Sequence, residues 1–237
     1  MKIEVFDDAD SVARAATAKI ASESRAVIAA RGHFALAVSG GHTPWIMLRA
    51  LASKDIPWVG VQLFQVDERV APDGHPDRNL THLRASLLQH VPLGPEQIHA
   101  MPVESNDLET AAKQYGDVLQ RVAGAPPVLD LVHLGLGPDG HTASLVPGDA
   151  VLSVADADVA LTGIYQGRRR MTLTYPAINR ARRILWVVTG SEKKEALHRL
   201  WVGDVSIPAG RVQREQALVL ADRASAGQLT AESKRGG

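Results

Sequence analysis

The sequence of 237 residues contains no cysteine. Disulfide bonds, thiol nucleophiles and cysteine metal sites are therefore excluded, and no spacing of His, Asp and Glu indicates a zinc site instead. The sequence also lacks net charge, because 26 basic residues balance 26 acidic ones. A surface that binds nucleic acid or a membrane usually carries an excess of basic residues, so we expect neither partner.

Long apolar runs are missing as well. No stretch of 18 apolar residues is present that could span a membrane. The first ten residues, MKIEVFDDAD, hold no apolar segment of the kind that a signal peptide needs, so we expect a cytoplasmic protein. Apolar residues still make up 45% of the chain, which suffices for a sizeable core. With no linker or internal repeat, residues 1–237 should form a single domain, of which about 224–237 are a frayed tail.

Residues 129–147, LDLVHLGLGPDGHTASLVP, are the most informative stretch. The apolar run at its start predicts a buried strand, and the three glycines that follow let the backbone turn sharply beside a ligand. Residues 142–144 could then start a short helix. Asp139 and His141 should therefore lie just past the carboxyl end of a core strand, where open α/β sheets bind their ligands.

The same stretch matches G-x-G-x-x-G, the fingerprint of dinucleotide-binding proteins. A lone match is weak, because the fingerprint also needs a long helix that opens within it and an acidic residue about 20 positions further on. Pro147 and Gly148 limit any helix here to a couple of turns, and no strand clearly ends at Asp156 or Asp158. We therefore do not expect an NAD cofactor.

A second glycine turn, SGGHTP at residues 39–44, follows an apolar strand at 34–38 and opens a helix. Its adjacent glycines expose free backbone N–H groups, and the positive end of the helix dipole favours an anion. Pro44 suits a first helical position, and Ser39 and Thr43 can donate further hydrogen bonds. The turn fits a phosphate group, although tight turns capped by a hydroxyl are also common where no ligand binds.

Strands and helices alternate along the chain, which predicts an α/β fold with a largely parallel sheet. Strands are expected at 2–6, 34–38, 61–66, 98–101, 129–136, 171–174, 184–188 and, as an edge strand, 217–220. Helices are expected up to about residue 30, from about 45, and at 79–90, 107–122, 176–181 and 191–201, the last capped by Ser191. Polar clusters follow four of the strands, at 39–43, 67–69, 139–141 and 189–193. If the strands are parallel, all four clusters meet at one edge of the sheet.

Five segments occur in a characteristic order and spacing: SGGHTP, VDERVAPDGHPDRN, LGLGPDGHTASLVP, RRRMTLTYPAIN and VVTGSEKKEAL. Together they resemble 6-phosphogluconolactonases, from about residue 34 to 200 and more loosely to 208. The resemblance implies a Rossmann-like α/β fold with helices on both faces of the sheet, of the type shared with glucosamine-6-phosphate and ribose-5-phosphate isomerases. It also implies hydrolysis of 6-phospho-D-glucono-1,5-lactone to 6-phospho-D-gluconate in the oxidative pentose phosphate pathway. The expected partner is this small phosphorylated sugar lactone, and no metal or other cofactor is needed.

Position by position, the resemblance matches His141 to the family's catalytic histidine. The substrate-binding positions that it implies are a phosphate loop and the residues around it: Ser39, Gly40, Gly41, His42, Thr43, Arg69, Gly140, Arg170 and Lys193. Arg168 and Arg169 remain alternatives to Arg170. The pattern is broken at two positions, since His42 stands where a serine or threonine is usual and Val146 where phenylalanine is frequent.

The implied chemistry suits these residues. A δ-lactone is an activated ester, and an imidazole with the ordinary histidine pKa of about 6.5 is mostly neutral and basic in the cell. We expect His141 to take a proton from the water that attacks C1 and then to protonate the departing ring oxygen. Asp67 and Asp139 are the acidic candidates, and Asp67 would orient His141 or bind sugar hydroxyls. N–H groups of nearby glycines are candidate donors to the carbonyl oxygen.

Two other functions are open on the same fold. An amino-sugar-6-phosphate isomerase or deaminase would, by its own family pattern, need a glutamate shortly after the Asp-Gly-His motif, and residues 144–150 contain none. A non-enzymatic sugar-phosphate sensor would carry a DNA-binding helix-turn-helix, which we do not expect in a chain whose first strand is predicted at 2–6. The sequence does not fix the oligomeric state; we expect a monomer, with a weak homodimer as the alternative.

Overall fold

The computed structural model describes residues 1–227 and residue 229, and its centre is a seven-stranded sheet. The strand order is β1-β10-β9-β6-β2-β3-β5, and every pairing in it is parallel. The strands are β1 (Lys2–Phe6), β2 (Phe34–Val38), β3 (Val61–Gln65), β5 (Ile98–His99), β6 (Leu131–Leu134), β9 (Ile184–Val188) and β10 (Ala217–Asp222). The α/β fold with a largely parallel sheet is therefore confirmed.

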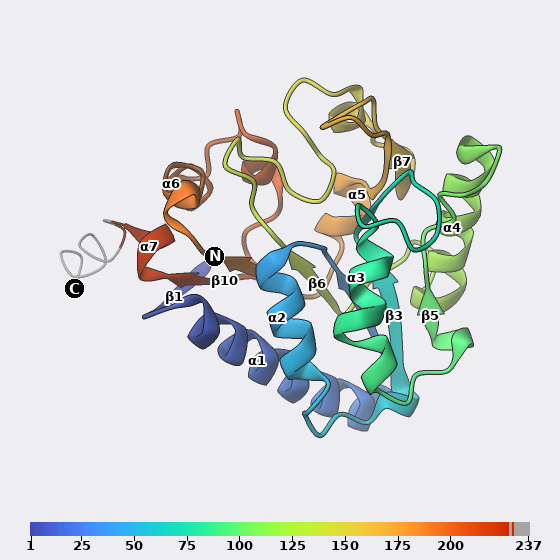
Figure 1. The fold of residues 1–237 in the computed structure, drawn as a ribbon, viewed down its shortest axis with the longest axis horizontal. Helices are drawn as coiled ribbons and strands as arrows, with labels where there is room; N and C mark the ends of the chain where they lie inside the picture. Colours follow the sequence, from blue (N-terminus) through green and yellow to red (C-terminus); the bar gives the residue numbers. More distant parts are fainter. Residues whose placement is uncertain (228, 230–237) are drawn as a thin grey trace.

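Helices cover both faces of this sheet. They are α1 (Ala9–Arg31), α2 (His42–Leu51), α3 (Asn79–Ser86), α4 (Leu108–Ala123), α5 (Tyr175–Asn179), α6 (Lys194–Val202) and α7 (Arg223–Ala226). Short 3₁₀ helices are η1 (Trp58–Gly60), η2 (Leu88–His90), η3 (Pro95–Gln97), η4 (Ala150–Ser153), η5 (Ser191–Lys193) and η6 (Pro208–Arg211). In Figure 1, α1 and α2 lie across the face of the sheet nearest the viewer. In the described part of the chain, no helix combines the length and apolar character that crossing a bilayer demands.

The period of two along the strands divides the core between these two layers. In β2, Leu36 packs with residues of α1, α2 and α3, whereas Ala35 and Ala37 pack with residues of α4 and α6. All five residues of β2 are buried, as are those of β9. Strands buried on both faces read as continuous apolar runs, which is why the sequence predicts them well.

Two predictions in the central stretch and near the C-terminus are wrong. Strand β10 is not an edge strand, because β1 pairs along its outer side and β9 along the other. Residues 142–144 do not begin a helix; Thr142 and Leu145 form a bridge, and Ala143 adopts φ 51°, which a helix does not allow.

Helix starts also differ from expectation. Helix α2 begins at His42 after the N-cap Gly41, so Pro44 is its third residue and not its first. Ser191 does not cap a helix but begins the 3₁₀ turn η5, whose N-cap is Gly190. Of the tail expected at 224–237, residues 224–226 belong to α7, and residues 228 and 230–237 lie outside the described residues.

A second, antiparallel sheet joins three short strands that the sequence analysis did not group together. Strand β8 (Arg170–Leu173) lies between β4 (Asp67–Arg69) and β7 (Val159–Leu161). In its register, Arg69 is opposite Arg170. The small sheet thus brings together two of the expected substrate-binding arginines.

Glu68, in the middle of β4, is fully buried and ties the small sheet to α3. Its carboxylate accepts hydrogen bonds from the backbone N–H groups of Asn79 (2.7 Å) and Leu80 (2.8 Å), the free donors of the first turn of α3. It also accepts from Gln65 Nε2 at 2.9 Å and pairs with Arg78 Nε at 3.2 Å. Arg78 is 2% exposed, so each charge depends on the other.

We expect Glu68→Gln to lower the free energy of unfolding by about 3–5 kcal/mol, the usual cost of leaving one half of a buried ion pair uncompensated. Chemical denaturation at neutral pH measures the change. Glu104→Gln is a matched control, because Glu104 also lies near Arg78 (3.7 Å) but is half exposed, and should cost under about 1 kcal/mol. Equal losses in the two variants would contradict the role assigned to Glu68.

Candidate active site

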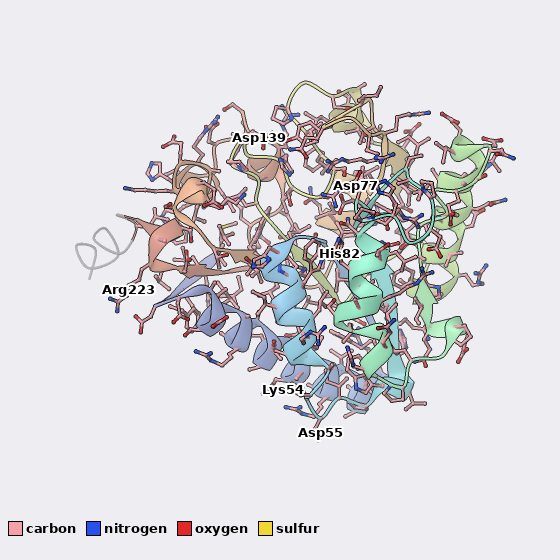
Figure 2. All side chains as sticks on the ribbon, in the orientation of Figure 1. Lys54, Asp55, Asp77, His82, Asp139 and Arg223 are labelled. Carbon is pink, nitrogen blue, oxygen red and sulfur yellow. The ribbon has the colours of Figure 1, made fainter. Side chains whose placement is uncertain are left out.

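A cavity of about 290 Å³ opens at the carboxyl edge of the large sheet. All four polar strand ends contribute to its wall, as the parallel arrangement requires. The predicted residues that line it are Ser39, Gly40, Gly41, His42, Thr43, Asp67, Arg69, His141, Arg170 and Lys193. Asp139 and Asp77 lie toward this end of the molecule in Figure 2, opposite Lys54 and Asp55, which precede β3.

His141 enters the cavity from the turn that follows β6. The turn is closed by hydrogen bonds from Gly137 N to His141 O (2.8 Å) and from Gly140 N to Gly137 O (3.0 Å). Both amides are therefore engaged and are not free to act as the glycine donors that the sequence suggested. Gly140 lies outside the cavity wall, where its positive φ and close approach to Ile207 leave no space for a side chain.

Asp139 holds the imidazole of His141. Its Oδ1 lies 2.5 Å from His141 Nδ1 and also accepts the backbone N–H of His141 at 3.1 Å. Burial acts to raise the pKa of Asp139, but the charge of His141 and the hydrogen bonds from His141 and Tyr165 outweigh it and leave this pKa below its ordinary value. An ionised carboxylate at Nδ1 places the ring proton there, so Nε2 is the basic nitrogen.

Asp67 is near His141 in the cavity wall but does not orient it. Its Oδ2 accepts from Ser144 Oγ at 2.7 Å, and its Oδ1 accepts from Asn79 Nδ2 at 3.3 Å. The orienting role that the sequence analysis offered for Asp67 belongs to Asp139 because of these contacts. Binding of sugar hydroxyls by Asp67 remains a prediction.

Another part of the cavity wall is the glycine turn before α2. Within the described residues, the N–H groups of Gly41, His42 and Thr43 donate to no protein acceptor, as is usual where a helix begins. The side chains are less free than expected, since Ser39 Oγ donates to His133 O (2.9 Å) and Thr43 Oγ1 lies 2.6 Å from Thr189 Oγ1. The backbone therefore supplies most of the donors for an anion.

Three cations face this turn or flank it. Arg69 donates to the carbonyl of Asp77 (3.0 Å) and to Asn79 Oδ1 (2.8 Å). Arg170 is 4% exposed, and its buried Nε has no partner in the described residues. Burial, opposed by the charge of Asp67, lowers the pKa of Arg170. Lys193 completes the set from η5.

The structure also separates the three consecutive arginines. Arg170 alone of the three lines this cavity. Arg168 pairs with Asp77 at 2.9 Å, and Arg169 pairs with Glu109 of α4 at 3.1 Å. Alternation along an extended chain turns Arg169 away from Arg170. Arg168 lies on the same side as Arg170 but precedes β8, and its ion pair with Asp77 keeps it at that turn.

Two residues of the site were not predicted. Asn79 lines the cavity and lies so close to Gly40 that a Cβ there would come within 2.0 Å of Asn79 Oδ1. Its place directly after the DERVAPDGHPDR segment was a usable signal. Tyr165 donates to Asp139 Oδ2 at 3.0 Å, and nothing in the pattern of its segment marked it.

Comparisons with known proteins agree with this geometry. The model of the family described as glucosamine-6-phosphate isomerases/6-phosphogluconolactonase matches residues 7–220. The chain belongs to this family. A 6-phosphogluconolactonase of Mycobacterium tuberculosis is 38% identical over 241 residues, covering 96% of this chain and 98% of the relative, and one of Nostoc sp. is 34% identical with the same coverage.

Solved structures show the shared fold. A 6-phosphogluconolactonase from Shewanella baltica superposes with a TM-score of 0.83 at 28% identity, over 94% of this chain and 97% of that one. A monomeric glucosamine-6-phosphate deaminase superposes with a TM-score of 0.84 over 95% and 99%, but at 18% identity, so it shows the fold alone. The fold therefore does not decide between a lactonase and a deaminase.

His133 lies beside the glycine turn at residues 39–44. It is fully buried in β6; its Nδ1 accepts from the backbone N–H of Ser39 at 3.3 Å, and its Nε2 has no partner in the described residues. Only one of the two ring nitrogens of His133 therefore has a partner among the described residues. Burial lowers the pKa of His133 to about 4.

We expect this histidine to make the protein less stable in acid. Above pH 6.5 it is neutral in both states, whereas between pH 6.5 and 4 the unfolded chain takes up a proton that the folded chain does not. Lowering the pKa of His133 from 6.5 to about 4 corresponds to about 3 kcal/mol of unfolding free energy, which is lost as the pH falls across that window.

Denaturation of the wild type and of His133→Asn at pH 7 and pH 4 tests this. The asparagine can still accept from Ser39 N but cannot take up a proton, so its stability should fall less over the window, by up to about 3 kcal/mol. A constant difference between the two proteins at both pH values would show that His133 is not the titrating group.

Proposed function

We propose that this protein hydrolyses 6-phospho-D-glucono-1,5-lactone to 6-phospho-D-gluconate, the second step of the oxidative pentose phosphate pathway. The observation that carries the proposal is one cavity lined by an oriented histidine, by three cations and by backbone amides that donate to no acceptor among the described residues. The names of the relatives from M. tuberculosis and Nostoc support it. We further propose that it acts on this small substrate alone, in the cytoplasm, as a monomer.

His141 is the general base of the proposed reaction. Asp139 keeps the proton on Nδ1, so Nε2 can take a proton from a water molecule as the oxygen attacks C1 of the lactone. The carboxylate also stabilises the imidazolium that results. When the tetrahedral intermediate collapses, the C1–O5 bond breaks and the same imidazolium returns its proton to the ring oxygen, which restores the neutral base.

The far end of the substrate is held by its phosphate. The amides of Gly41, His42 and Thr43 and the ammonium of Lys193 would bind it, and replacing the usual hydroxyl residue by His42 leaves the backbone donor in place. Because the phosphate is remote from C1, its binding energy can be used to hold C1 against His141. The amides of Gly137 and Gly140 are engaged, so Arg69 and Arg170, which line the cavity, are the proposed donors to the charge on the carbonyl oxygen.

The two rival functions fit the site less well. A deaminase needs a glutamate after the Asp-Gly-His motif, and the residues there are Ser144 to Ala150, without a carboxylate before Asp149. Asp149 is occupied, since it accepts from Val151 N and Gly163 N. A sensor would not need an ionised carboxylate behind a histidine.

Within the described residues, no group of three His, Asp or Glu side chains is arranged to hold a metal ion.

The direct test is hydrolysis of freshly prepared 6-phosphogluconolactone, corrected for its spontaneous reaction. Unphosphorylated gluconolactone should be a far poorer substrate, and Lys193→Ala should raise KM about tenfold or more with a smaller change in kcat, because a charge-assisted contact to phosphate is lost. Lys194→Ala, one residue further on and outside the cavity, is the control and should change neither value. Equal kcat/KM for the two lactones would overturn the phosphate assignment.

We expect His141→Asn to remain folded and to bind 6-phosphogluconate, but to lose about 10²–10⁴-fold in kcat. The wild-type rate should also fall on the acid side as His141 takes up a proton, and the variant should lose this dependence. Thermal unfolding and kcat are measured on one preparation. A variant that keeps more than about a tenth of the wild-type kcat would exclude the general base, since the expected loss is larger.

A further inference from the structure

Tyr165 contacts both the Asp139–His141 pair and Arg170. Its hydroxyl donates to Asp139 Oδ2 at 3.0 Å and lies 3.3 Å from His141 Nδ1. Its ring meets the imidazole of His141 edge to face, with centroids 5.4 Å apart and planes at 67°. The ring of Tyr165 also contacts Arg170, whose guanidinium carbon lies 4.9 Å from the ring centroid.

The segment that carries Tyr165 is built to hold it there. Tyr165 and Arg168 close a tight turn through two backbone hydrogen bonds of 2.9 and 3.3 Å, with Gln166 and Gly167 at φ 52° and 79° between them. Gln166 Oε1 accepts a hydrogen bond from Arg170 Nη2 at 3.0 Å. Ile164 is 78% exposed, whereas Tyr165 next to it is partly buried against the site. The turn therefore directs one aromatic side chain inward.

The hydroxyl completes the hydrogen bonding of Asp139. Oδ1 is already shared by the ring and backbone nitrogens of His141, so Tyr165 satisfies the other oxygen, Oδ2. Burial, then the hydrogen bond to Asp139, raises the pKa of Tyr165, which keeps the phenol protonated and able to donate. A donor on Oδ2 fixes the carboxylate plane and draws charge away from His141.

We infer that Tyr165 is a positioning residue for the proposed lactone hydrolysis, its hydroxyl aligning Asp139 with His141 and its ring holding the guanidinium of Arg170 toward the substrate. The inference rests on the proposed function and adds a residue to it. The two roles use different parts of one side chain, so they can be separated by substitution.

Tyr165→Phe removes the hydroxyl and keeps the ring. We expect kcat to fall about three- to tenfold, with KM little changed. Without the donor, Asp139 attracts the imidazolium more strongly, so the acid limb of the kcat/KM profile should move up by about half a pH unit to one unit. The other charged groups around the cavity stay the same in this variant: Asp67, Arg69, Arg170, Glu192 and Lys193.

Tyr165→Leu removes the ring as well, and should in addition raise KM about two- to fivefold, the range expected for one cation–π contact. Ile164→Ala, directly before the same turn and exposed to solvent, is the matched control for both variants and should match the wild type in kcat, KM and pH profile. A purely structural role for Tyr165 predicts a lower melting temperature with an unchanged acid limb, and that result overturns the inference.

An NMR titration of the His141 ring separates this inference from the proposed function, because it needs no turnover. In Tyr165→Phe the titration midpoint of His141 should rise by the same half to one unit, whichever substrate the protein uses. A midpoint within about 0.1 unit of the wild type would disprove the positioning role even in an active lactonase, since charge redistribution of this size must appear there. A shifted midpoint in a protein without lactonase activity would instead leave Tyr165 in place and overturn the proposed function.

Discussion

The parallel pairing of β2, β3, β6 and β9 is the constraint on which the site depends. These strands are buried on both faces, so their register is set by the core and not by any ligand. Because their carboxyl ends lie at one edge, loops as far apart in the sequence as residues 39 and 193 line one cavity. A site residue is thus positioned chiefly by the burial of the strand before it.

Gathering cations in one place opposes folding unless something else holds them. The small antiparallel sheet provides this support, because its register sets Arg69 opposite Arg170 and Glu68 fastens β4 to the first turn of α3. Arg170 is buried without an ion-pair partner among the described residues. An anionic ligand would supply the negative charge that Arg170 lacks. The fold therefore holds this cation in place for an anion before the ligand binds.

Long apolar runs in the sequence made the core strands predictable. Short strands and contacts between residues far apart in the sequence could not be predicted in this way. The strands Phe34–Val38 and Ile184–Val188 have the predicted bounds, since a continuous apolar run that ends at polar or glycine residues has few other readings. The three-residue strands of the small sheet are too short to show a period. Asp67 was offered as the partner of His141 because strand ends converge, but which carboxylate touches which ring depends on one turn of the backbone. The position of the Tyr165 side chain depends on a turn with two positive φ angles, which the sequence of that segment does not predict.

The Asp139–His141 pair and the scaffold around it are encoded differently. Asp139 and His141 are two residues apart, so a single closed turn presents them together, whereas the amides and cations of the cavity come from several loops. The segment after this turn is used for support: Ser144 Oγ holds Asp67, and Leu145 and Val146 are buried in the core. A glutamate at position 144, 145 or 146 would have to displace one of these contacts. On a fold that also serves a deaminase, the residues of this segment, and not the fold, distinguish the two candidate reactions.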